Sequence, residues 1–166
     1  MSRPAAWGKE PPAWLLALVG VLALVTIAVA AWAWTRPDPV AAEDDARDAR
    51  QTAEQAVIPV LTYDYRTLDD DEKEAESYLT ASYRRTFADL WQTIEDNAPA
   101  AKTVITAKVV GSGVVHATPG RVQVLVLVDR PTSNTENTTP VTYQDHVTLT
   151  MVKTGGVWLI DDLVTQ

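Results

Sequence analysis

The feature that most constrains this chain is an apolar run near its beginning, "AWLLALVGVLALVTIAVAAWAW" at residues 13–34, which holds no charge and no proline. A helix rises about 1.5 Å per residue, so roughly 20 apolar residues cross a hydrocarbon core about 30 Å thick. Trp14, Trp32 and Trp34 stand at its two ends, where amphipathic rings settle at the headgroup layers. The run therefore predicts a single transmembrane helix over residues 13–35.

A cleavable signal peptide is the competing interpretation of this segment. Arg3 and Lys9 form a basic start, and Ala31-Trp32-Ala33 fits the small-x-small pattern that precedes a cleavage point. The apolar core of a signal peptide, however, spans about 7 to 15 residues, and the core of this segment is longer. We therefore favour an anchor that stays uncleaved.

The sequence indicates the orientation of the span only weakly, because the numbers of basic residues on its two sides are nearly equal. The short N-terminal side carries a net positive charge, and long hydrophilic domains cross membranes largely regardless of their charge. We expect a cytoplasmic tail at residues 1–12 and a proline-containing linker at 36–40. The extracytoplasmic domain is expected at 41–166.

The net charge of −8 is concentrated in one part of the chain. Between Glu43 and Glu76 there are twelve acidic and four basic residues. Such a surface repels phosphates and anionic headgroups, which argues against nucleic-acid binding. The chain has no cysteine, so disulfides and thiolate metal sites are excluded.

Helical periodicity extends over residues 41–98. The first stripe, from Ala42 to Leu61, is mostly alanine, and Pro59 is expected to kink this helix or split off its last turn. An alanine face lets another element approach closely; alternatively it forms a weak coiled-coil seam, so a homo-oligomer is possible. Asp69 is the expected N-cap of a second helix. The third begins at about residue 81, with an apolar stripe of Tyr83, Phe87, Leu90, Trp91 and Ile94.

Alternating, β-branched residues follow over residues 102–165 and predict four or five antiparallel strands. Gly111-Ser112-Gly113 indicates a turn or a bulge, and Gly155-Gly156 indicates a hairpin turn. The apolar run in "RVQVLVLVD" (121–129) predicts a central strand covered on both faces. The polar segment "RPTSNTENTTP" (130–140) predicts a loop.

Helices followed by strands indicate an α+β fold, in which about three helices pack on one face of a curved, mainly antiparallel sheet. This order, together with the last hairpin "GGVWLIDDL", is similar to the nuclear transport factor two-like cone fold. The resemblance implies a cone-shaped domain behind the membrane anchor.

Within that fold, the run "AEQAVIPVLTYDYRTLDDDEKEAESYLTASYRRTFADLW" (53–91) resembles the helical half of the Mce-associated membrane proteins of actinobacteria. The segments "VQVLVLVDRPTSN" and "VTLTMVKTGGVWLIDDL" resemble the strands of that family. The resemblance implies a single-pass accessory subunit of a lipid-transport system in the cell envelope, with no catalytic activity. The architecture also looks similar to the periplasmic scaffolds of type IV secretion machines.

The corner "LTYDYRTLDDD" (61–71) holds the best acid–base candidate, Asp64. Burial between Tyr63 and Tyr65 would raise the pKa of Asp64 and make it a possible base. The favoured alternative is a local pair of Asp64 with Arg66. A pocket between helices and sheet would be lined by Tyr63, Asp64, Tyr83, Phe87, Trp91 and Tyr143.

The remaining chemical candidates are few. Asp145 and His146 are adjacent, so on a strand they point to opposite faces and cannot act together. His116 has no carboxylate nearby in sequence. The run "DDDE" at 69–72 lacks the ligand spacing of a calcium loop and is better explained by helix capping. We expect no catalytic residue, metal or cofactor.

The sequence therefore predicts a non-enzymatic, membrane-anchored scaffold or accessory subunit that works by protein–protein contact. The expected contact surfaces are the acidic first helix and the polar loop at residues 130–140. The competing function is a domain that binds a small apolar ligand, or an enzyme, using the pocket between helices and sheet. A cone filled by its own side chains would argue against this second function.

Overall fold

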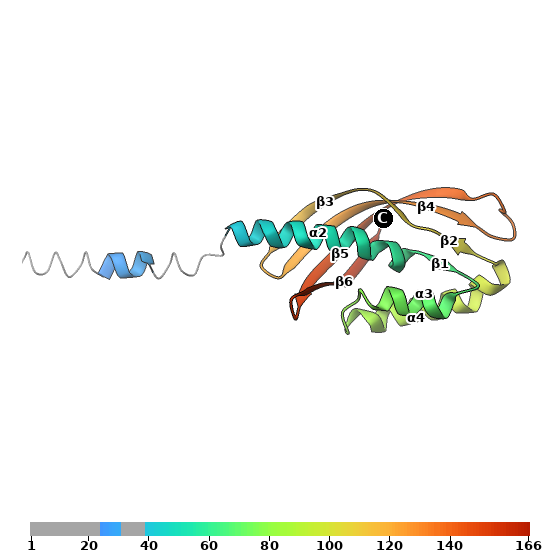
Figure 1. Ribbon diagram of the computed structural model, residues 1–166, viewed down its shortest axis with the longest axis horizontal. Helices are drawn as coiled ribbons and strands as arrows, with labels where there is room; N and C mark the ends of the chain where they lie inside the picture. The colour runs from blue at the N-terminus through green and yellow to red at the C-terminus, as the bar shows by residue number, and fades with distance from the viewer. Residues whose placement is uncertain (1–23, 31–38) are drawn as a thin grey trace, which may run out of the picture. The chain divides into compact units, whose positions relative to one another are not determined.

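A computed structural model describes residues 24–30 and 39–166 of the chain (Figure 1). The chain divides into two units, residues 1–38 and residues 39–166. Most of the predicted membrane span and all of the predicted tail lie outside the described residues. The part of the span that is described, residues 24–30, is helical with exposed side chains. Over the described ranges, no helix combines the length and the apolar composition that a membrane crossing requires.

Three helices form the first half of the larger unit, and their bounds are α2 Pro39–Leu61, α3 Leu68–Glu76 and α4 Tyr83–Ala101. Helix α2 begins inside the predicted linker because proline is favoured in a first helical turn, where its missing amide has no partner to lose. The helix also runs through Pro59 to Leu61, so the expectation that Pro59 splits off the last turn was wrong. Helix α4 ends at a left-handed residue, Lys102 (φ 51°).

The predicted cap of α3 was wrong: the N-cap is Thr67, and Asp69 lies in the first turn. The helix starts earlier because Leu68 is buried, and a helix that begins there brings Leu68 and Ala75 onto one inward face. The hydroxyl of Thr67 donates to the carboxylate of Asp71 (3.1 Å) rather than capping the backbone.

The sheet has six strands among the described residues. Five of them lie in the order β1-β2-β4-β5-β6, and β3 pairs with β4 on the same side of β4 as β2. All of these pairs are antiparallel. Two of the strands are only two residues long, which explains why the sequence predicted four or five. Their bounds are β1 Tyr63–Asp64, β2 Val104–Ile105, β3 Lys108–Thr118, β4 Arg121–Ser133, β5 Val141–Thr154 and β6 Val157–Thr165.

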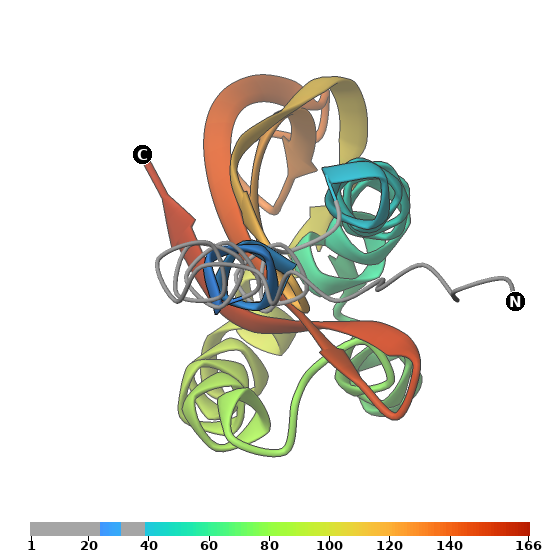
Figure 2. The ribbon, with the colours of Figure 1, turned by 90° about the vertical axis from the view of Figure 1, so that its left-hand side faces the viewer.

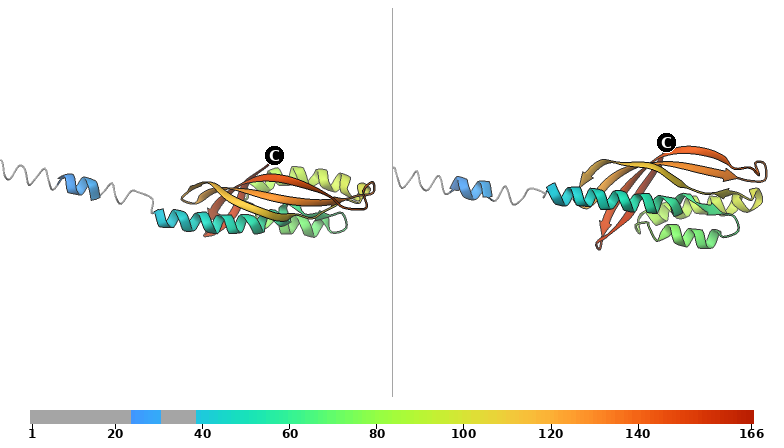
Figure 3. Two further views of the ribbon diagram at one scale, coloured as in Figure 1. Left: turned by 90° about the horizontal axis from the view of Figure 1, so that it is seen from above. Right: turned by 45° about the horizontal axis from the view of Figure 1, so that its top comes forward.

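The sheet curls over the helices, as the view along the long axis shows (Figure 2). In Figure 3, α2 runs beside the strands, while α3 and α4 lie near one end of the sheet, with α3 on the side of α2 and α4 on the other side. The segment before α4 also joins the sheet, because the amide of Thr80 donates to the carbonyl of Ile160 (2.9 Å). The predicted α+β cone with helices on a curved antiparallel sheet is therefore confirmed.

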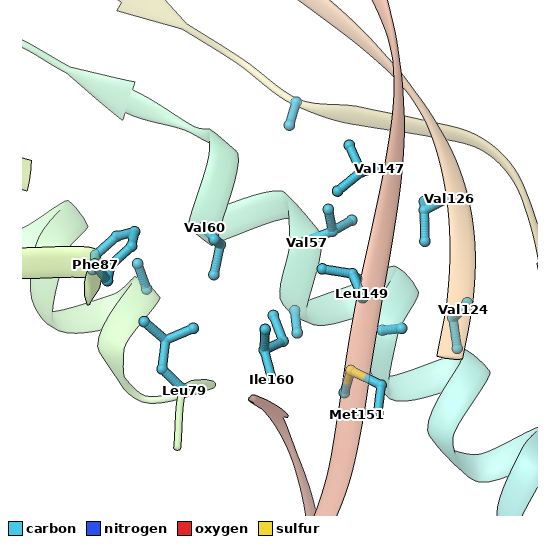
Figure 4. Packing of buried hydrophobic residues seen from close by; sticks show 14 of the residues in the cluster. Val57, Val60, Leu79, Phe87, Val124, Val126, Val147, Leu149, Met151 and Ile160 are labelled. Carbon is cyan, nitrogen blue, oxygen red and sulfur yellow. The ribbon is translucent and has the colours of Figure 1, made fainter. Parts of the chain in front are cut away.

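The core lies between α2 and the concave face of the sheet (Figure 4). Val57 and Val60 of α2 meet the inward side chains of β4 and β5, with Leu79 and Ile160 closing one end. The alternation predicted for β5 is confirmed. The fully buried strand residues are Val122, Val124, Val126, Val128, Val147, Leu149, Met151 and Ile160.

The prediction that β4 is covered on both faces was wrong. Its buried residues alternate, and Leu127 on the other face is 38% exposed. The polar segment that follows was also only partly a loop. Residues 130–133 continue β4, because residues 132–133 pair with β2 on one side and residues 130–132 pair with β5 on the other. The loop itself is shorter and covers residues 134–140.

Candidate functional site

The space between the helices and the sheet, where a ligand pocket was predicted, is occupied by aromatic side chains. Phe87 and Trp91 of α4 are 3% and 1% exposed, and their ring centroids lie 5.4 Å apart. Tyr63 of β1 meets Trp91 edge to face at 6.2 Å. Burial raises the pKa of Tyr63, so its hydroxyl stays protonated. These three predicted pocket residues thus pack on one another, as parts of the core.

The two remaining tyrosines of the predicted pocket lie apart from this group. Tyr83 is half-buried at the start of α4 and packs against the core, and burial raises its pKa. Tyr143 follows the predicted alternation, since it pairs with Arg130 on the concave face of the sheet. It is nevertheless 54% exposed, because β5 continues beyond the residues that α2 covers.

The corner between α2 and α3 holds Asp64 as a local ion pair rather than a base. Nε of Arg66 donates to Oδ1 and Oδ2 of Asp64 at 2.9 and 3.1 Å, and Nη2 of Arg66 also donates to Oδ2. These bonds hold the pKa of Asp64 below its ordinary value. The carboxylate of Asp71 also lies at this corner, where it accepts a hydrogen bond from the backbone amide of Asp64 (2.8 Å). The predicted pair is confirmed, and an Asp64 with a raised pKa is contradicted.

The second carboxylate near the cone, Asp145, is also bound by an arginine. It lies on the concave face and forms an ion pair with Arg130. His146 points the other way, as predicted: it stands opposite Leu127 and is exposed. His116 of β3 is exposed as well. Neither histidine is hydrogen-bonded through its side chain to a carboxylate among the described residues, so no acid–base pair forms.

Helix α2 is fastened to the sheet along one side. At its N-terminal end, the carboxylate of Asp45 accepts hydrogen bonds from the ammonium of Lys153 (2.7 Å) and from the amide of Gly120 (3.4 Å). One turn further, Arg50 and Glu54 both contact the hydroxyl of Ser112 on β3. The acidic helix predicted as a free contact surface is thus partly engaged with its own domain.

The alanine stripe of α2 is buried inside the domain. Ala49, Ala53 and Ala56 are each 0% exposed and belong to the core cluster. The close approach of helix and sheet that alanine permits therefore takes place within one chain. This finding contradicts the alternative in which the stripe is a seam between two copies.

The predicted contact loop lies at the far end of the sheet from these ties. The amide of Thr135 donates to the carbonyl of Ala101 (2.8 Å), which fixes the loop to the end of α4. A hollow of about 420 Å³ opens here, lined by Tyr65, Lys102, Ser133, Asn134, Thr135 and Thr138. It is an open surface feature lined by both polar and apolar atoms. Among the described residues, no group of three or more His, Asp or Glu side chains is arranged to hold a metal.

One surface was missed in the sequence, namely the second edge of β3. This strand pairs with β4 on one side, and no other strand among the described residues pairs with it on the opposite side. Val110 and Val115 on it are 58% and 60% exposed. The signal was present as "VVGSGVV" (109–115), in which the central Gly111-Ser112-Gly113 was interpreted as a turn or bulge beside strand residues.

Comparison with known proteins gives a relative in mycobacteria. The chain is 35% identical over 128 residues to Rv1362c, an uncharacterized protein of Mycobacterium tuberculosis strain H37Rv. The match covers 75% of this chain, and it spans 57% of the length of that relative. No protein-family model matches the sequence.

Solved structures share the fold at low sequence identity. An IcmL-like type IV secretion system protein from Legionella pneumophila superposes with a TM-score of 0.60 at 17% identity, over 78% of this chain and 93% of that one. The periplasmic domain of DotI gives a TM-score of 0.57 at 18% identity, over 70% and 91% of the two chains. The predicted similarity to type IV secretion domains is confirmed at the level of the fold.

Proposed function

We propose that this chain is a membrane-anchored, non-catalytic subunit of a bacterial envelope complex, and that it acts through protein–protein contacts. The observation that carries the proposal is the filled cone. Phe87, Trp91 and Tyr63 occupy the place where a domain of this shape would hold a ligand. Both carboxylates near the cone, Asp64 and Asp145, are bound by arginines and unavailable as bases.

The proposed topology has residues 1–12 in the cytoplasm, a span at 13–35 and the domain outside the cytoplasmic membrane. The uncharged run of the sequence supports the span. The likeness of the domain to a periplasmic domain supports its placement on the outer side. A shared fold does not establish where this chain is located in the cell, so the proposed topology requires its own test.

Topology can be tested by labelling single cysteines, because the natural chain has none. Ser2→Cys lies in the proposed tail and Thr138→Cys lies in the exposed loop of the domain. In intact cells, a membrane-impermeant maleimide should label the second variant, and should label the first only after lysis. Labelling of Ser2→Cys in intact cells would contradict the proposed orientation.

The complex that we propose is an Mce-type lipid-transport system. Support comes from the resemblance of residues 53–91 to the Mce-associated proteins and from the mycobacterial relative. The structures with the same fold come instead from type IV secretion. The two assignments name different partners, so the identity of the co-purified proteins decides between them.

The deciding experiment is affinity purification of the full chain from native membranes in mild detergent. Mce transporter subunits should co-purify with it. A matched variant in which residues 134–140 are replaced by a Gly/Ser segment should recover less of them, because the exposed loop is the proposed contact. Type IV secretion subunits in their place would overturn the Mce assignment. If no envelope protein is recovered with either chain, the scaffold role itself fails.

A further inference from the structure

The edge of β3 that faces away from β4 is a long edge without a partner strand among the described residues. On one side its amides and carbonyls pair with β4 from Lys108 to Thr118. On the other side, no described residue forms a backbone ladder with it. Helix α2 contacts the strand from the concave face, where Arg50 and Glu54 reach the hydroxyl of Ser112. An open edge of this length is a template for another strand.

This edge carries little of the protection that natural edge strands usually have. Over residues 108–118 the ionisable residues are Lys108 and His116, one near each end. Between them, Val110, Val114 and Val115 are 58%, 40% and 60% exposed. Charged side chains or prolines would normally discourage edge-to-edge pairing here, and this stretch has neither.

Two β-bulges are the protective devices that β3 does have. The register against β4 shifts between Val109 and Gly111, and again between Val114 and His116. The bulges leave a regular run from Gly111 to Val114 between them. They therefore limit the length of a pairing without removing its centre.

Neither the backbone angles nor the space inside the domain require glycine at the two glycines of that run. Neither Gly111 nor Gly113 has a positive φ, so an L side chain would fit the backbone. A Cβ added to Gly113 would meet nothing within 4 Å, and one added to Gly111 would only touch Leu127 at 3.9 Å. Glycine weakens a strand and often marks a bulge or a place where another backbone approaches closely. Gly111 adjoins a bulge, whereas Gly113 does not.

The sequence of the edge also identifies what fits it. "VVGSGVV" (109–115) reads the same in both directions about Ser112. If two copies run antiparallel about a two-fold axis at Ser112, Val110 faces Val114, and Gly111 faces Gly113. An interface of this kind is isologous, so one surface patch must complement itself. The palindrome meets that requirement within the regular run, where Gly111 faces Gly113, and Val110, the extra residue of the first bulge, lies opposite Val114 at the border of this run.

The charges beside the edge obey the same symmetry. Arg50 and Glu54 lie one helical turn apart, and both contact Ser112 at the centre of the palindrome. The two-fold axis reverses their order along the strand. Arg50 of one copy therefore faces Glu54 of the other, which places opposite charges on both sides of the axis.

We propose that β3 pairs antiparallel with β3 of a second copy of this chain, centred on Ser112, so that the two sheets become continuous. The partner at this edge is thus the chain itself. The inference is independent of the proposed function, because it rests on β3 and the α2 side chains beside it and holds for an Mce-type complex, a secretion complex or neither. It supplies a surface for self-association in place of the buried alanine stripe.

The proposed register of the two β3 strands predicts a specific pattern of disulfide crosslinks. The natural chain has no cysteine, so every crosslink comes from the introduced residues. Two variants of the full chain, Val110→Cys and Val114→Cys, are prepared in detergent, and each is oxidised alone and in a mixture. Facing residues have Cβ atoms about 4.5–5.5 Å apart, close to disulfide distance. Copies of one variant place their cysteines four residues out of register, roughly 13 Å apart. The mixture should therefore crosslink at least tenfold faster than either variant alone.

A crosslink rate in the mixture no higher than in the single variants would overturn this pairing. A second measurement uses charge: Val114→Lys should shift the full chain toward the monomer, raising the dimer dissociation constant at least tenfold. Val157→Lys is the matched control, since Val157 is equally apolar and 60% exposed on a different strand. Equal effects of the two lysines, or no dimer in the natural chain at micromolar concentration, would also overturn it.

Discussion

The ammonium of Lys153, near the end of β5, lies 2.7 Å from a carboxylate oxygen of Asp45 in the second turn of α2. The residues are 108 positions apart in the chain. The same ammonium stands 5.5 Å from the ring centre of Trp158. This contact joins the first described helix of the domain to its last hairpin, so it reports on whether the N-terminal end of α2 is docked.

The first prediction concerns the pH dependence of that contact. The hydrogen bond from Lys153 lowers the pKa of Asp45 below its ordinary 3.8. The folded state therefore binds a proton at Asp45 less readily than the unfolded chain does. The stabilisation is present in full above pH 3.8, and it is lost as the pH falls through the lower pKa of the folded state.

The measurement is the melting temperature of the natural chain and of Asp45→Asn between about pH 6 and pH 2. The natural chain should melt higher at pH 6, by roughly 2–4 °C, and the difference should shrink as the pH falls through the titration of Asp45. Lys73→Ala is the control for a surface pair, because its partner Asp70 is 85% exposed. A difference that stays constant down to pH 2 would show that the contact is absent in solution.

The second prediction separates two neighbours in α4. Trp91 is 1% exposed and packs against Phe87 and Tyr63, whereas Leu90 is 57% exposed. Trp91→Ala should lower the free energy of unfolding by about 3–5 kcal/mol, because it leaves a large cavity. Leu90→Ala should change it by less than about 0.5 kcal/mol. Urea denaturation followed by far-ultraviolet circular dichroism measures both, and similar losses would contradict the placement of α4.

Which of these residues is buried could be predicted from the sequence only in part. The spacing of Phe87 and Trp91 identified an apolar stripe, but Leu90 fits the same stripe and is exposed. A helical period locates a face to within about one residue position, and the width of the covering element decides where the face ends. Tyr143 shows the same limit on a strand, because its alternation was right and its burial was not.

The errors in β4 have a different physical origin. A strand whose two faces are both apolar has no alternation, so the sequence from Val124 to Val128 could not show that only one face is covered. The edge of β3 and the pairing of β2 with residues 132–133 depend on which strands become neighbours. That information comes from the topology of the sheet and is absent from any short segment.

The third prediction concerns Asp161, which holds the segment before α4 against the sheet. The hydroxyls of Thr80 and Ser82 donate to it at 3.1 and 3.2 Å, and Arg121 donates to its other oxygen at 3.1 Å. Burial opposes ionisation, but these bonds outweigh it and lower the pKa of Asp161. Thr80 in turn accepts the first amide of α4, from Tyr83 (3.2 Å).

Asp161→Ala should therefore lower the free energy of unfolding by about 1–3 kcal/mol, since it leaves several donors without their acceptor. It should also speed hydrogen exchange of the Thr80 amide, which bonds to Ile160. Asp162→Ala is the matched control, because Asp162 is the exposed neighbour. If both variants lose the same stability, the network around Asp161 is not what fixes this segment.

The fourth prediction compares two glycines of the sheet. Gly156 closes the last hairpin with φ +87°, a conformation that side chains other than glycine rarely adopt, so Gly156→Ala should cost about 1 kcal/mol or more. Gly113 has no such constraint, and an added Cβ meets nothing. Gly113→Ala should raise the stability by up to about 1 kcal/mol, because alanine restricts the unfolded chain.

Thermal melts of the two variants, at a concentration where the chain is monomeric, give the sign of the change in stability for each. A loss of stability in Gly113→Ala would mean that its backbone or its surroundings differ from those described. The expected gain has a further consequence for the free edge of β3. If alanine at residue 113 is better for the monomer, the stability of the single domain does not account for glycine at this position. A contact outside the domain would account for it, and the proposed strand pair places Gly113 opposite Gly111 of the second copy.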